Sequence, residues 1–235
     1  MYQQVNQITL PQARQEASTI FLAKVFNLMT VGLAITGLVA FFTANTGLAN
    51  LIIGSPLFII LMLAELGLVF YLSARVEKIQ AATASGLFIG YSVLNGLTLS
   101  VIFLAYTNTS IAATFFITAG MFGAMAVYGL VTKRDLSGLG SFLFMGLIGI
   151  IIASIVNIFL KSSSVDWMIS CLGVLIFTGL TAYDVQKIKR IGEEGILAQG
   201  DEVVRKGAVM GALALYLDFI NLFLMLLRFF GGSRD

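Results

Sequence analysis

Two aspartates stand inside long apolar stretches near the end of the chain, where an acidic side chain is least expected. Asp184 lies in the segment LIFTGLTAYDVQKI, and Asp218 lies in LALYLDFINLFL. An ionisable group at membrane depth is costly, and such groups mark ion or proton paths when they occur. We therefore take Asp184 and Asp218 as the candidate centre of function.

A pair of carboxyl groups held close together has a defined chemistry. Two carboxylates within a few ångströms cannot both ionise cheaply, so they tend to share one proton and to act as a pH switch. When both are ionised they offer the oxygen ligands that calcium prefers, but they supply far fewer than its usual set of about six to eight. Any calcium bound by Asp184 and Asp218 should therefore be held weakly, as a conduction path requires.

The composition places these aspartates in a membrane. Of 235 residues, 58% are hydrophobic and 11% are charged, so the polar residues could not cover the surface of a soluble globule. Apolar windows of about twenty residues, the length that crosses roughly 30 Å of hydrocarbon, predict transmembrane helices at 22–43, 52–74, 83–106, 111–132, 139–161, 167–187 and 207–230. We predict an all-α membrane protein in which residues 21–235 form a single seven-helix transmembrane domain, after a polar cytoplasmic tail at residues 1–20.

The distribution of basic residues predicts the orientation of the bundle. With the N-terminus in the cytoplasm, eleven of the fourteen basic residues fall inside, and only Lys161, Arg228 and Arg234 fall outside. This bias follows the positive-inside rule. The N-terminus should be cytoplasmic and the C-terminus outside. The net charge of +2 reflects this topology, and no basic patch with interleaved aromatic residues indicates a nucleic-acid partner.

The last predicted helix carries a stripe of small and polar residues. Gly207, Gly211, Ala214, Asp218 and Asn221 follow each other at steps of four, three, four and three, which puts them on one face. A helix that faces lipid would not carry such a stripe, and the glycines would allow close approach to neighbouring helices. We expect the last helix to be central, with Asp218 directed into the bundle.

The sixth predicted helix offers a matching face, on which Thr181 precedes Asp184 by three residues and Tyr183 is adjacent in sequence. Lys187 and Lys189 follow closely, so Asp184 could instead be an interfacial carboxylate. The two aspartates can meet only if the start of the last helix, residues 203–210, projects into the cytoplasm. The charged segment 187–206 should be a solvated connection, in part helical.

Other polar residues lie in the second and third predicted helices. Glu65 is well inside the second helix, where a carboxyl group must be protonated or paired. Arg75 ends that helix at a height suited to pairing with Asp184, or to anchoring the topology. Tyr91, Asn95 and Thr98 form a polar strip at steps of four and three, a pattern typical of interhelical hydrogen bonds.

Several classes of chemistry are excluded. The chain has no histidine, which rules out histidine-assisted nucleophilic catalysis and histidine-ligated zinc or haem. No phosphate-binding loop of the G-x-x-x-x-G-K-S/T type is present, so ATP-driven transport is not expected. Cys171 is the single cysteine, so no disulfide can form within the chain. We expect no cofactor, with calcium only as a transported ion.

Three blocks of sequence resemble the bacterial branch of the transmembrane Bax inhibitor motif family: SVLNGLTLSVIF, GLTAYDVQKIK and ALYLDFINLFLMLLRFFGGSRD. The resemblance extends from about residue 20 through essentially the whole chain. It implies a seven-helix bundle with a central last helix, in a bacterial plasma (inner) membrane, and a pH-sensitive calcium leak. It also implies that Asp184 and Asp218 form the sensor and that Arg75 can latch onto one of them, with Glu65 similar in placement to an acidic residue of the family. The lysine-rich tail of eukaryotic relatives is absent, because the chain ends in GGSRD.

Two alternatives remain open from the sequence. One is a non-conducting regulator that binds other membrane proteins. The other is an intramembrane aspartyl protease, in which one aspartate also follows a tyrosine, as Tyr183 and Asp184 do. The protease pattern G-x-G-D is replaced here by residues 215–218, and its Pro-Ala-Leu motif is missing, since the prolines are Pro11 and Pro56. We therefore do not expect an enzyme. Supporting polar roles are assigned to Tyr183, Thr181, Asn221 and Asn95.

Overall fold

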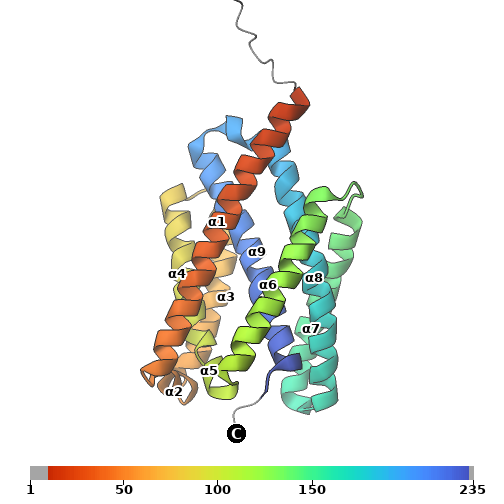
Figure 1. Cartoon of the computed structure of the whole chain (residues 1–235). Helices are drawn as coiled ribbons and strands as arrows, with labels where there is room; N and C mark the ends of the chain where they lie inside the picture. The colour runs from red at the N-terminus through yellow and green to blue at the C-terminus, as the bar shows by residue number, and fades with distance from the viewer. Residues whose placement is uncertain (1–9, 233–235) are drawn as a thin grey trace, which may run out of the picture.

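The computed structural model describes residues 10–232, and every regular element in that range is a helix (Figure 1). The long helices are α1 (Leu10–Asn45), α3 (Leu57–Arg75), α4 (Ala81–Leu99), α6 (Asn108–Val131), α7 (Ser137–Leu160), α8 (Ser163–Glu193) and α9 (Asp201–Phe230). Shorter ones are α2 (Leu48–Ile53), α5 (Ile102–Ala105) and the 3-10 helix η1 (Ile196–Gln199). Seven helices are long and apolar enough to cross a membrane, which confirms the predicted fold class.

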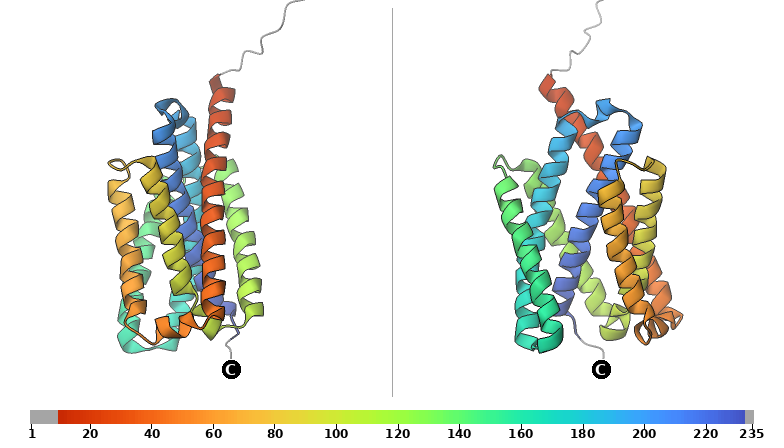
Figure 2. Two further views of the ribbon diagram at one scale, coloured as in Figure 1. Left: turned by 90° about the vertical axis from the view of Figure 1, so that its left-hand side faces the viewer. Right: turned by 180° about the vertical axis from the view of Figure 1, so that it is seen from behind.

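Helix α9 lies at the centre of the bundle, as the small and polar stripe predicted. It packs against α1, α4, α6 and α8, and 67% of its most apolar window is buried, against 11% for α3 and for α7. Figure 2 shows α3 and α7 at the periphery, on opposite sides of the bundle. Most of the side chains of α9 are buried, including those of Leu215, Tyr216 and Leu222.

Small residues set how closely the helices approach. Lipid tails are as apolar as leucine, so packing and hydrogen bonds, rather than burial from water, hold transmembrane helices together. A side chain at Gly129 of α6 would overlap the backbone carbonyl of Ala182 in α8. A side chain at Gly211 of α9 would press on Val25 of α1 and Ile188 of α8. These glycines place α8 and α9 in close contact with their neighbours around the two aspartates.

The connection between α8 and α9 is shorter than the apolar windows predicted. The helices extend into the charged segment at both ends, so only residues 194–200 connect α8 to α9, through η1. Lysine, arginine and glutamate are good helix formers, so a helix can continue into water after its apolar part ends. Gly195 (φ 89°) and Gly200 (φ 94°) make the turn, in a backbone region that other residues rarely adopt.

The start of α1 and the end of α9 lie at opposite ends of the bundle, as an odd number of spans requires (Figure 1). Helix α1 already begins at Leu10, so residues 10–20 of the expected polar tail continue the first spanning helix. Residues 1–9 of that tail lie outside the described residues. At the other end, the carbonyl of Gly232 accepts from the Thr107 backbone N–H, and its own N–H donates to Ser110 Oγ. These bonds fix the end of α9 beside the start of α6.

Candidate functional site

Helices α8 and α9 run antiparallel and bring the two aspartates together. The carboxyl groups of Asp184 and Asp218 lie close enough to interact with each other. Along the same interface Gly173 faces Met225, and Ile188 faces Gly211, as expected for antiparallel helices in register. Asp218 is only 5% exposed, whereas Asp184 is partly buried. Two carboxyl groups this close can form a hydrogen bond when one of them carries a proton.

The start of α9 projects beyond the end of α8, and this offset places Asp184 and Asp218 at the same depth in the bundle. Asp218 lies about 26 Å along α9 from Asp201, whereas Asp184 lies about 14 Å before the end of α8 at Glu193. Gly207 lies beside Ile196 of η1, and therefore already beyond α8. The projection that the sequence required is present in the structure.

Apolar side chains cover the pair on the side toward the start of α9. About two turns before Asp218, Gly211 packs between Val25 of α1 and Ile188 of α8. One turn further, Gly207 packs against Phe21 of α1. Phe21 and Val25 are completely buried. The carboxyl pair is thus separated from that end of the bundle by a layer of tightly packed apolar groups.

The polar side chains expected to support the pair bond elsewhere. Thr181 Oγ1 donates to the Phe177 carbonyl at 2.8 Å, and Asn221 Nδ2 donates to the Leu217 carbonyl at 2.8 Å, both within their own helices. The ring of Tyr183 lies against Gly140 of α7. Within residues 10–232, no hydroxyl, amide or backbone N–H bonds to Asp218 Oδ2, although this oxygen is buried.

Arg75 lies away from the pair. It is exposed at the end of α3, and α3 packs mainly against α4. Among the residues described, no ion pair joins Arg75 to a carboxylate. The basic side chain whose charge acts on Asp184 is Lys187, three residues further along α8. A latch by Arg75 would require a different arrangement of α3.

Glu65 belongs to a second polar cluster, on the other side of α9. Thr98 Oγ1 donates to Glu65 Oε1 at 2.7 Å, and Asn95 Nδ2 donates to Glu65 Oε2 at 3.3 Å, which joins α3 to α4. The Tyr91 ring packs edge-on against Tyr216 of α9 at 5.6 Å. Asn95 and Thr98 of the predicted strip thus make interhelical hydrogen bonds, with the carboxyl group of Glu65 as acceptor, whereas Tyr91 makes a ring contact with α9.

Tyr216 extends this cluster to α1, because its hydroxyl is hydrogen-bonded to Thr36 Oγ1 at 2.6 Å. Tyr216 precedes Asp218 by two residues, which places the two side chains on nearly opposite faces of α9. The Glu65 cluster and the carboxyl pair are therefore separate sites.

Sequence reasoning missed the contacts that anchor α8 just beyond Asp184. Gln186 accepts from the Leu136 backbone N–H at 2.9 Å and donates to the Arg134 carbonyl at 2.8 Å, holding the loop between α6 and α7. Gln186 is 6% exposed, although its neighbour Lys187 is exposed. An amide between Val185 and Lys187, two positions after Asp184, was the only signal in the sequence.

An exposed ion pair reinforces this loop. Arg190 Nη2 lies 2.6 Å from Asp135 Oδ1, and Asp135 also accepts from the backbone N–H of Ser137 at 3.0 Å. The Ser137 backbone N–H, then its hydroxyl, then Arg190 lower the pKa of Asp135 from its ordinary 3.8 to about 2. The loop is therefore attached to α8 by an ionised carboxylate throughout the physiological pH range.

Within residues 10–232, no three His, Cys, Asp or Glu side chains come close enough together to hold a metal ion.

The fold and the site define an all-helical membrane protein with a carboxyl pair formed by its central helix α9 and the neighbouring helix α8. The family described as "Inhibitor of apoptosis-promoting Bax1" matches residues 19–235, and the chain belongs to this Bax inhibitor family.

Similar proteins cover nearly the whole chain. "Inner membrane protein YbhL" of Escherichia coli K12 is 53% identical over 216 residues, which are 91% of this chain and 92% of that protein. An "Uncharacterized protein" of Borreliella burgdorferi is 50% identical over 232 residues, which are 97% of this chain and 99% of that protein. "Uncharacterized protein RP147" of Rickettsia prowazekii is 46% identical over 216 residues, 92% of this chain and 90% of its own. The resemblance inferred from the three sequence blocks is confirmed.

Proposed function

We propose that this protein is a pH-sensitive calcium leak channel, gated by Asp184 and Asp218. The observation that carries the proposal is the close approach of these two carboxyl groups, one on α8 and one on the central helix α9. Ionisable groups at membrane depth serve ion and proton paths.

The proposed mechanism follows from the single proton of the pair. Loss of this proton leaves two negative charges side by side, and their repulsion weakens the contact between α8 and α9. The same charges attract a divalent cation and offer it oxygen ligands. Because water or carbonyl groups must complete the coordination, binding is weak and the ion can leave again. The protonation of the pair thus biases a two-state bundle.

The proposed location is the inner membrane of a bacterium. The name of the Escherichia coli relative carries this location, and the seven spanning helices agree with it. The excess of basic residues at one end of the bundle favours a cytoplasmic N-terminus and an outer C-terminus. A reporter fused after Asp235 that behaves as cytoplasmic would contradict this orientation.

Calcium flux into liposomes that contain only the purified protein tests the proposal. A calcium indicator trapped inside should report entry above that of protein-free liposomes, and the rate should depend on pH. Entry no faster than in protein-free liposomes at every pH would contradict a conducting role. That outcome would instead favour a non-conducting regulator, which needs other membrane proteins in order to act.

A further inference from the structure

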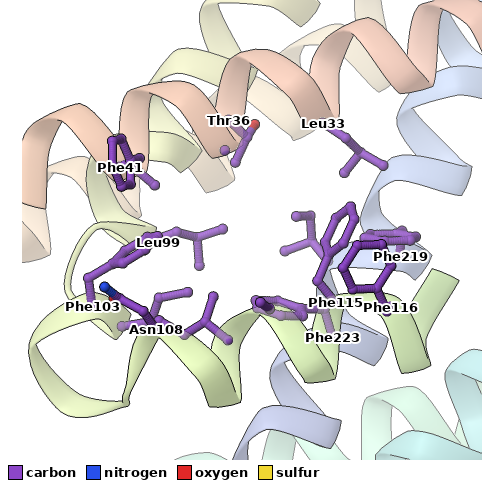
Figure 3. A pocket seen from close by; sticks show the side chains of 16 residues that line it. Leu33, Thr36, Phe41, Leu99, Phe103, Asn108, Phe115, Phe116, Phe219 and Phe223 are labelled. Atoms are coloured by element: carbon purple, nitrogen blue, oxygen red, sulfur yellow. The ribbon is translucent and has the colours of Figure 1, made fainter. Parts of the chain in front are cut away.

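An apolar pocket of about 370 Å³ lies between α1, the α4–α5 segment, α6 and α9 (Figure 3). Its walls include Leu33 and Phe41 of α1, Phe115 of α6 and Phe219 of α9. Thr36 is one of its two polar side chains, and its hydroxyl is already bonded to Tyr216, to the Gly32 carbonyl and to the Ser92 carbonyl. The interior therefore offers hydrocarbon surface and no free hydrogen-bonding group.

The pocket opens sideways from the bundle. Helices α1 and α6 both pack on α8 and α9, but they have little contact with each other, and α9 is visible between them in Figure 1. Phe41 and Phe116, on the two sides of the opening, are 49% and 73% exposed. Every lining residue belongs to a membrane-spanning helix segment, so the opening faces the hydrocarbon of the bilayer.

The pocket extends from the edge of the membrane to the central helix. Asn108, the first residue of α6, is its other polar lining residue and lies at the end of the span, at the height of lipid headgroups. At the inner wall are Phe219 and Ile220, which are 4% and 8% exposed and directly follow Asp218.

We propose that this pocket binds one acyl chain of a membrane phospholipid, with the headgroup beside Asn108. Water is a poor occupant, because a buried water needs two or more polar partners and the interior has none free. A lipid tail matches the lining in polarity and reaches the opening directly from the bilayer. A phospholipid also accounts for the position of the polar Asn108 at the end of the pocket. This binding site does not depend on whether the protein conducts calcium.

Photolabelling in the bilayer can detect the occupant. The protein would be reconstituted with a phospholipid that carries a diazirine in its tail, illuminated, digested and mapped by mass spectrometry. The wild type should be labelled on α9 at Phe219 and Ile220, which are buried and can be reached by a tail only through the pocket. Labels confined to outward-facing residues of α1 and α6 would overturn the proposal. Labelling of α9 by a diazirine fatty acid, but not by the phospholipid, would overturn the phospholipid as occupant.

A pocket-filling variant provides the matched comparison. Gly37 lines the pocket, and a side chain added there would meet no atom within 4 Å. Gly37→Phe should therefore fill the pocket without a backbone clash and abolish labelling of α9. Gly149→Phe on α7, also in open space, should leave it unchanged. If Gly37→Phe does not fold, Ala112→Phe on the α6 wall replaces it. Undiminished labelling of α9 in a folded pocket-filling variant would refute the site.

Discussion

Replacing either aspartate of the pair with asparagine should remove most of the pH dependence of calcium flux. Asparagine keeps the size of aspartate and can donate its amide N–H to the remaining carboxylate, so the contact between Asp184 and Asp218 is retained while its proton is lost. The proposed mechanism gives the pair one shared proton. One proton changes an equilibrium at most about tenfold per pH unit, or about 1.4 kcal/mol. The steepest part of the wild-type profile should therefore approach, and not exceed, this slope.

The assay is the initial rate of calcium entry into proteoliposomes, measured at matched protein density over a series of pH values. Asp184→Asn and Asp218→Asn should each give a nearly flat profile, and the double variant should differ little from either, because each single change already removes the shared proton. Asp201→Asn, which removes an exposed carboxylate from the same helix, should keep the wild-type profile. If both single variants fold and retain the wild-type slope, the pair is structural and the gating mechanism is refuted.

Three further predictions concern packing, a latch and the loop between α6 and α7. Gly129→Ala should destabilise the protein by about 1–3 kcal/mol, because the added methyl group overlaps the backbone of α8. The control Gly123→Ala, on the open side of α6, should not destabilise it. Equal unfolding temperatures of the two variants would contradict this. If Arg75 latches a closed arrangement, Arg75→Ala should raise the calcium leak at neutral pH, whereas the control Lys78→Ala should not. An unchanged leak in a folded Arg75→Ala variant would leave Arg75 as a topology anchor. Asp135→Asn should lower the unfolding temperature at neutral pH. This difference should shrink as pH falls from 3.8 to about 2, because the lowered pKa of Asp135 keeps the carboxylate that holds the loop ionised down to that range. A difference in unfolding temperature that is independent of pH would contradict this.

The features that could be predicted from the sequence are those that depend on the residues of a single helix. The stripe through Gly211 and Asp218 predicted a central last helix, because small and polar residues on one face are unfavourable against lipid. The apolar windows gave the number of spans, because hydropathy measures what the bilayer accepts. They missed the ends of α8 and α9, because a helix does not stop where the hydrocarbon stops.

Features that depend on how two helices are rotated against each other could not be predicted. The bonds of Gln186 to the α6–α7 loop require that α8 turn its amide away from solvent, which no spacing within α8 specifies. The same holds for the acceptor role of Glu65 toward Thr98, and for the pocket between α1 and α6. Hydropathy treats lipid-facing and protein-facing apolar residues alike, so it cannot show where helices leave a space between them.

The central claim is that one proton shared by Asp184 and Asp218 controls the flux. Infrared spectroscopy detects the carbonyl band of a protonated carboxyl group and can be recorded on the same proteoliposomes as the flux. The difference between wild type and Asp218→Asn isolates the band of the pair. The account predicts that this band disappears over the same pH range in which calcium flux changes. A flux that changes with pH while the band stays constant, or a band unaffected by Asp218→Asn, would contradict it.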